Sequence, residues 1–78
     1  MEIKIKFNLG SKVTGINIEH KIVAFEVGKI AVSVKANGTE VEYYPSDGKG
    51  GYDFRCFNEK YCFPTEADAL AYIKGDQS

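Results

Sequence analysis

The sequence predicts a mostly β, β-rich α+β fold: five to six short antiparallel strands in a bent sheet or small barrel, closed by one C-terminal α-helix over about residues 66–74. Apolar and polar residues alternate over much of the chain, as they do in half-buried strands. Turn signals recur every 8–12 residues or so, which is typical of small all-β architectures. With 78 residues the chain is large enough for one hydrophobic core, so we expect a single domain, 1–78.

The first strands are predicted near the N-terminus. Residues 2–7 alternate apolar and charged side chains, which indicates a strand with one buried face. Residues 12–19 predict a weaker strand, because Gly15 interrupts the alternation.

A three-stranded meander is predicted over residues 21–44. Gly28-Lys29 is a plausible two-residue turn, since glycine can adopt positive φ. Asn37-Gly38 is the strongest hairpin signal in the chain, because both residues tolerate the positive φ of a type I′ turn. The meander residues on which the expected core depends most are Val23, Phe25, Val32 and Val34.

Two more short strands and the helix are predicted after a glycine-rich loop at residues 45–51. The strands cover residues 52–57 and 61–63, with the turn at 58–60 between them. Pro64 and Thr65 precede the helix, with Thr65 as N-cap residue, and Gly75 is expected to end it. Asp68 completes an acidic form of the capping box. The apolar stripe expected to dock on the sheet contains Ala67, Leu70, Ala71 and Ile73.

The opening and closing segments resemble a known kind of protein. Residues 7–13, Phe-Asn-Leu-Gly-Ser-Lys-Val, look like the start of SH3-like small barrels, and the strand pair around Gly28 looks like their central hairpin. Residues 62–70, Cys-Phe-Pro-Thr-Glu-Ala-Asp-Ala-Leu, resemble the end of small proteins of phages, prophages and gut-bacterial mobile elements. The resemblance implies an SH3-like barrel with a short C-terminal helix, and a role as a small regulator of host proteins. It brings no catalytic residues, and the strand at residues 2–7 departs from its pattern.

Charge and composition narrow the classes of function. Ten basic and eleven acidic residues are interspersed, so the basic excess typical of nucleic-acid binding is not visible. No apolar run approaches the ~20 residues of a membrane span, and the alternating N-terminus does not resemble a signal peptide. We therefore expect a cytoplasmic protein without membrane contact.

Residues with catalytic or metal-binding potential are few. His20 is the only histidine and is expected at the surface. The one catalytic pair worth naming would combine His20 as the base with Cys56 or Cys62 as the nucleophile. The glycine-rich loop around Lys49 lacks the order and context of a phosphate-binding loop, although it could be a contact loop. We expect no enzyme, no cofactor, no metal and no small-molecule substrate.

The two cysteines leave alternatives open. Around a three-residue hairpin loop Cys56 would face Cys62, at a Cα separation that a disulfide accepts. Two buried free thiols are the preferred interpretation, since cytosolic chains rarely keep disulfides. A zinc site would need four ligands, and His20 is the only other soft one.

An aromatic cluster supplies the candidate binding residues. By strand alternation Tyr43, Tyr52 and Phe54 are expected in the core. The residues then expected to face outward are Tyr44, Phe57 and Tyr61. These three could be covered by the C-terminal helix, contact a protein partner, or stack on single-stranded nucleic acid.

The leading hypothesis is a non-enzymatic, protein-binding or regulatory module that contacts a partner, or a second copy through a sheet edge. Its candidate partner-binding residues are Tyr44, Phe57, Tyr61 and Lys49. The alternative is a nucleic-acid-binding small barrel that would use Lys4, Lys6, Lys12, Lys21, Lys29 and Lys35.

Overall fold

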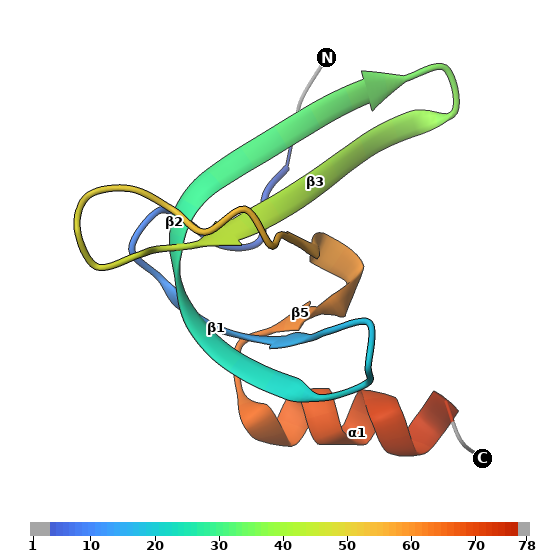
Figure 1. Ribbon diagram of the computed structural model, residues 1–78. Coiled ribbons are helices and arrows are strands. Elements are labelled where there is room, and N and C mark those ends of the chain that lie inside the picture. Colours follow the sequence, from blue (N-terminus) through green and yellow to red (C-terminus); the bar gives the residue numbers. More distant parts are fainter. Residues whose placement is uncertain (1–3, 77–78) are drawn as a thin grey trace.

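The computed structural model describes residues 4–76, and within them the protein is a five-stranded antiparallel sheet with one α-helix (Figure 1). This confirms the predicted mostly β fold with a C-terminal helix. The elements are β1 (Lys12–Ile16), β2 (Ile22–Lys35), β3 (Gly38–Pro45), β4 (Phe57–Asn58), the 3₁₀ turn η1 (Glu59–Tyr61), β5 (Cys62–Phe63) and α1 (Glu66–Asp76). The strand order across the sheet is β4-β3-β2-β1-β5.

Strand β2 is long and bent, and it belongs to both halves of the sheet (Figure 1). Its first half pairs with β1 and its second half with β3, and the register shifts between Val27 and Lys29. A Cβ on Gly28 would lie 2.7 Å from the Cα of Ser46, so the backbones approach too closely there for any side chain. The predicted turn at Gly28-Lys29 is therefore wrong: the glycine permits a bulge and a bend, and the strand continues.

The two edge strands are neighbours in the sequence but pair with opposite ends of the sheet. Strand β4 pairs with β3, and β5 pairs with β1. Asn58 caps the 3₁₀ turn between them, because its Oδ1 accepts a hydrogen bond from the Lys60 amide at 3.2 Å. The predicted hairpin between residues 52–57 and 61–63 is wrong, since η1 carries the chain across to the other edge.

The hairpin that joins β2 to β3 is confirmed, but its turn differs from the expected one. Lys35 pairs with Gly38, so the connecting residues are Ala36 and Asn37. Among the described residues other than glycine, only His20 has a positive φ, and Gly38 adopts φ 134°. Asn37 therefore does not adopt the positive φ that a type I′ turn requires.

The core lies where the two halves of the sheet face each other. Its buried residues are Val13, Val27, Val41, Tyr43, Phe57 and Cys62. Phe25 stacks on Phe57, with ring centroids 4.7 Å apart and planes at 15°. Four residues were expected to form the core. Two of them, Val23 and Phe25, are half-buried and pack against it, so the prediction is confirmed in part. Val32 and Val34 are instead 40% and 57% exposed, because they lie on the far part of the hairpin.

Residues 4–7 contact the sheet at Tyr43 without joining it as a strand. Residues 4–7 form no strand, so the predicted strand 2–7 is wrong there, and residues 2–3 lie outside the described part. The amides of Lys6 and Phe7 donate instead to the Tyr43 hydroxyl, at 3.1 and 3.2 Å. The Phe7 ring packs edge-on against Tyr43. A side chain thus replaces the strand partner that the alternation had suggested.

Helix α1 begins as predicted and contacts β1, β2 and β5. Thr65 Oγ1 accepts a hydrogen bond from the Asp68 amide at 3.2 Å, which confirms the N-cap. The helix continues to Asp76, so the expected end at Gly75 is wrong. The expected stripe is also largely wrong, since Ala67, Leu70 and Ala71 are exposed and only Ile73 is half-buried. The contacts are made by Ala69, which is fully buried, and by Tyr72, whose ring meets Tyr61 and Phe63.

No helix among residues 4–76 is both long and apolar enough to pass through a membrane.

Candidate partner-binding surfaces

Three aromatic rings and a lysine gather on the outer surface where β2 and β3 meet the segment after the glycine-rich loop. Tyr44 and Tyr52 meet edge to face at 5.4 Å, and Tyr52 meets Phe54 in the same way at 6.0 Å. Lys29 Nζ lies 5.2 Å from the ring centre of Tyr44 and 4.6 Å from that of Tyr52. It also donates to the Tyr52 hydroxyl at 3.1 Å, which raises the lysine pKa. We call Lys29, Tyr44, Tyr52 and Phe54 the aromatic patch.

The rings of the patch differ in their exposure to solvent. Phe54 is 86% exposed and Tyr52 is 37% exposed, whereas Tyr44 is half-buried. The expectation that Tyr52 and Phe54 are core residues is therefore wrong. The alternation rule fails because residues 53–56 belong to no strand and Tyr52 joins the sheet only through a bridge to Ser46.

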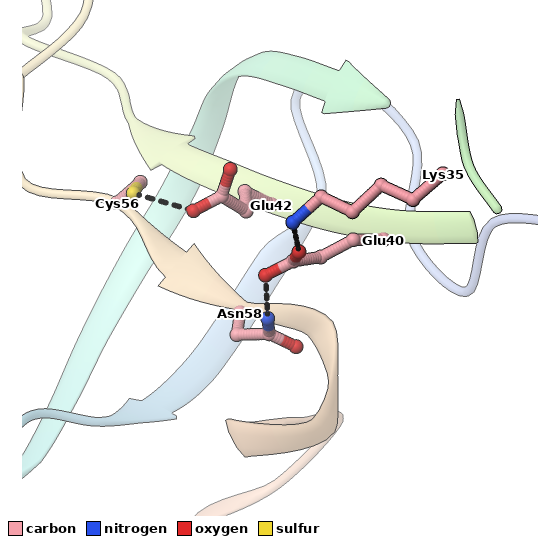
Figure 2. A network of polar contacts seen from close by, with 5 residues as sticks. All are labelled: Lys35, Glu40, Glu42, Cys56 and Asn58. Atoms are coloured by element: carbon pink, nitrogen blue, oxygen red, sulfur yellow. Dashed lines mark hydrogen bonds and ion pairs between the residues drawn. The ribbon is translucent and has the colours of Figure 1, made fainter. Parts of the chain in front are cut away.

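Cys56 borders the patch as a protonated thiol. Its Sγ donates to Glu42 Oε2 at 3.2 Å (Figure 2). Partial burial and the Glu42 carboxylate both raise the thiol pKa. Cys62 is buried, and burial raises its pKa to about 12. Both cysteines are free, so the disulfide alternative is wrong, and Cys56 is exposed rather than buried.

A second polar contact ties the β2–β3 hairpin to β4. Lys35 Nζ lies 2.7 Å from Glu40 Oε2, and Asn58 Nδ2 donates to Glu40 Oε1 at 2.8 Å (Figure 2). The lysine and the asparagine both lower the Glu40 pKa. The ammonium of Lys35 is thus already occupied by a carboxylate of its own hairpin.

A groove of about 1160 Å³ is lined by polar and apolar side chains alike, and its lining includes Asp53 and Arg55, the two neighbours of Phe54 in the sequence. The stacked rings of Phe25 and Phe57 form part of its lining, and so do Tyr72 and Ile73 of α1. The remaining apolar side chains that line the groove are Ile16, Ile18, Val23, Ala24, Pro45 and Tyr61.

The charged side chains in the lining of the groove are mainly acidic. Glu19, Glu26 and Asp53 line it, and Arg55 is the only lysine or arginine among the lining residues of the described chain. His20 also lines the groove; it is exposed, as predicted, and adopts φ 62° in the turn between β1 and β2. Asn17 fixes that turn, because its Oδ1 accepts hydrogen bonds from the amides of Glu19 and Lys21.

The four residues predicted to bind a partner lie in three different places. Tyr44 belongs to the aromatic patch. Phe57 is only 8% exposed, so the expectation that it faces outward is wrong; it forms the lining of the groove. Tyr61 also lines the groove, is half-buried and packs on Tyr72, so the helix covers it in part. Lys49 lies apart from them, on the glycine-rich loop.

Asp47 organises this loop. Its Oδ1 accepts hydrogen bonds from the amides of Lys49 and Gly51, at 2.7 and 2.9 Å. Gly48 and Gly50 adopt positive φ, which lets the chain turn tightly around the carboxylate. The backbone amides therefore point at a side chain of the protein, not at an open anion site.

Three patch residues were not among the residues predicted to bind a protein partner: Lys29, Tyr52 and Phe54. Lys29 was named only for the nucleic-acid alternative. A signal was present in the sequence, since Tyr52 and Phe54 follow directly on a glycine-rich loop, where large apolar side chains need not enter a core. No cluster of three or more histidine, cysteine or carboxylate side chains suited to a metal occurs within residues 4–76.

Comparison of the chain with protein-family models, with curated proteins and with solved structures finds no match.

Proposed function

We propose that this protein is a non-enzymatic protein-binding module whose contact surface is the aromatic patch. The observation that carries the proposal is the exposure of Phe54, at 86%, beside two tyrosine rings that already hold each other and Lys29 in place. Exposed apolar clusters of this kind mark interaction sites on soluble domains.

The patch has the properties of an interface anchor. Fully burying a phenylalanine side chain contributes about 1.5–3 kcal/mol, and Phe54 has most of its surface still to bury. Tyrosine is enriched among residues that dominate binding energy. Because ring contacts and the Lys29 hydrogen bond already restrict Tyr52, its ordering on binding costs little side-chain entropy.

The resemblance to SH3-like small barrels of phages and mobile elements enters the same proposal. It rests on the sequence patterns of residues 7–13 and 62–70. A cytoplasmic regulator of host proteins is the role that this resemblance suggests, and it rests on analogy at the level of the fold.

The nucleic-acid alternative has less support. Three of the six lysines that it would use are engaged: Lys21 with Glu19 at 3.5 Å, Lys35 with Glu40, and Lys29 with the tyrosines. A phosphate backbone would have to compete with these contacts. Binding to single-stranded or duplex DNA that weakens as salt increases would favour this alternative over the protein-binding proposal.

The proposal is tested with a displayed library of random peptides, selected on sparsely immobilised wild-type protein. We expect enriched peptides whose affinity falls at least tenfold for Phe54→Ala, the loss typical of an interface anchor. Leu9→Ala is the matched control, since Leu9 is 66% exposed and outside the patch.

Two results would contradict the proposal. One is a selection on wild-type protein that enriches no binding peptide. The other is a set of peptides that bind Phe54→Ala and wild type equally well, because the patch would then contribute nothing.

A further inference from the structure

We propose that the partner of the aromatic patch is a second copy of this chain, in a two-fold dimer in which Phe54 of each copy inserts into the groove of the other. The inference rests on the proposed function, since it takes the patch to be a protein-contact surface.

The anchor and the groove are adjacent in one molecule. Asp53 and Arg55 line the groove, whereas Phe54 between them does not and is directed to solvent beside Tyr52. A two-fold interface uses the same patch on both copies, so an anchor and its receptor must lie within one continuous surface. The segment 53–55 meets this condition, because a two-fold axis close to it brings each Phe54 to the opposite groove.

The groove suits an aromatic ring. Phe25 and Phe57 are stacked in its lining, and within residues 4–76 neither ring contacts a third ring. Aromatic side chains pack favourably in offset-stacked or edge-on arrangements, and an inserted phenylalanine would contact the pair on Phe25, which is half-buried. The groove volume of about 1160 Å³ also exceeds what a single ring fills, which leaves room for the residues that flank Phe54.

The charges are complementary between copies. The groove lining contains three carboxylates, of Glu19, Glu26 and Asp53, and one cation, Arg55, while the patch carries the ammonium of Lys29. A two-fold axis near residue 54 places Asp53 of one copy opposite Arg55 of the other, and does so twice. Complementary potentials of this kind select the partner and fix the register of an interface.

The area that a dimer needs is a small part of the surface of the chain. The described chain exposes 5669 Å², and a standard interface removes about 800 Å² from each partner, roughly one seventh of that surface. Residues 53–55 carry Phe54 of the patch and two residues of the groove lining, so an interface centred on this segment contacts both.

The experiment is sedimentation equilibrium over a range of protein concentrations, combined with a charge-swap complementation. Wild type is expected to pass from monomer to dimer as concentration rises. Phe54→Ala changes only an exposed side chain and is expected to weaken the dimer at least tenfold, whereas Leu9→Ala leaves it unchanged.

The charge swap isolates the contact across the two-fold axis. Asp53→Arg alone and Arg55→Asp alone place like charges opposite each other, so each variant is expected to be monomeric. An equimolar mixture of the two is expected to form heterodimers, because the opposite charges then face each other at both contacts. Thermal melts of each variant establish that it is folded before mixing.

Three results would overturn the dimer: a wild-type monomer at every concentration up to about 1 mM, assembly into larger polymers, or association that Phe54→Ala leaves intact. A mixture of charge variants that stays monomeric although both fold would overturn the reciprocal geometry. The proposed function is tested separately, since monomeric Asp53→Arg keeps the patch and should still bind displayed peptides.

Discussion

Replacing Gly15 by alanine tests whether the stacked pair Phe25–Phe57 is as rigid as the structure indicates. A Cβ at residue 15 would lie 2.6 Å from Phe57 Cδ2 and 2.9 Å from Phe25 Cε1. Ordinary contact begins near 3.4 Å, so the Phe57 ring must retreat by about 0.8 Å, the difference between these distances. The backbone of Phe57 is paired with Tyr43 and its ring stacks on Phe25, so this movement disturbs both contacts.

Overpacking of a core by a methyl group costs about 1–3 kcal/mol. In a domain of this size each kcal/mol lowers Tm by about 4–8 °C, so Gly15→Ala is expected to melt roughly 4–24 °C below wild type. Thermal unfolding followed by circular dichroism measures the shift.

Gly75→Ala is the matched control for Gly15→Ala. Gly75 lies in α1, and a Cβ there would meet no atom within 4 Å. Alanine is favoured over glycine in a helix, so this variant should lose no stability. If Gly15→Ala melted within about 2 °C of wild type, the rings would be free to move and the groove lining would not be preformed.

Three further predictions concern Tyr43 and the cysteines. Tyr43→Phe removes the hydroxyl that donates to Glu59 at 2.6 Å and accepts from two N-terminal amides. We expect the free energy of unfolding, measured by urea titration, to fall by about 1–3 kcal/mol. An unchanged urea midpoint would contradict this. Burial raises the pKa of Tyr43 from 10.0, and that of Cys62 from 9.0, to about 12. Because the neutral forms are favoured in the folded state, this stability is complete below pH 9 and is lost as the pH rises towards 12; a flat alkaline stability curve would refute it. Alkylation of native protein should modify the exposed Cys56 alone, and mass spectra with two adducts before unfolding would show that Cys62 is not protected.

Local signals in the sequence predicted the parts of the fold that local chemistry determines. Thr65 caps α1 because a threonine hydroxyl before a helix satisfies a free amide, and nothing distant competes with it. The β2–β3 hairpin forms around Asn37 and Gly38 for a similar reason, although the positive φ falls on the glycine alone.

Contacts between distant residues decided the features that were not predicted. Gly28 is indistinguishable from a turn glycine in the sequence, but its role depends on the approach of Ser46. The N-terminal residues alternate like a strand, yet their amides are satisfied by the hydroxyl of Tyr43, more than thirty positions away. Neither relationship has a local sequence signal.

The candidate site was predicted only in part. Tyr44 lies in β3, where alternation holds, and it does reach the patch. Phe57 was placed on the wrong face because residues 52–57 were read as one regular strand, whereas the strand begins only at Phe57 itself. The same assumption placed Tyr52 and Phe54 in the core and concealed the most exposed aromatic side chain of the patch.

Fluorine NMR of protein labelled with fluorophenylalanine tests most directly whether Phe54 contacts the groove of a second copy. The chain has five phenylalanines, and the Phe54 signal is assigned by its loss in Phe54→Leu. We predict that the signals of Phe54, Phe25 and Phe57 shift together and saturate as protein concentration rises, while that of Phe63 stays constant. A Phe54 signal that does not respond to concentration, or one that moves while both groove phenylalanines stay fixed, would contradict the account.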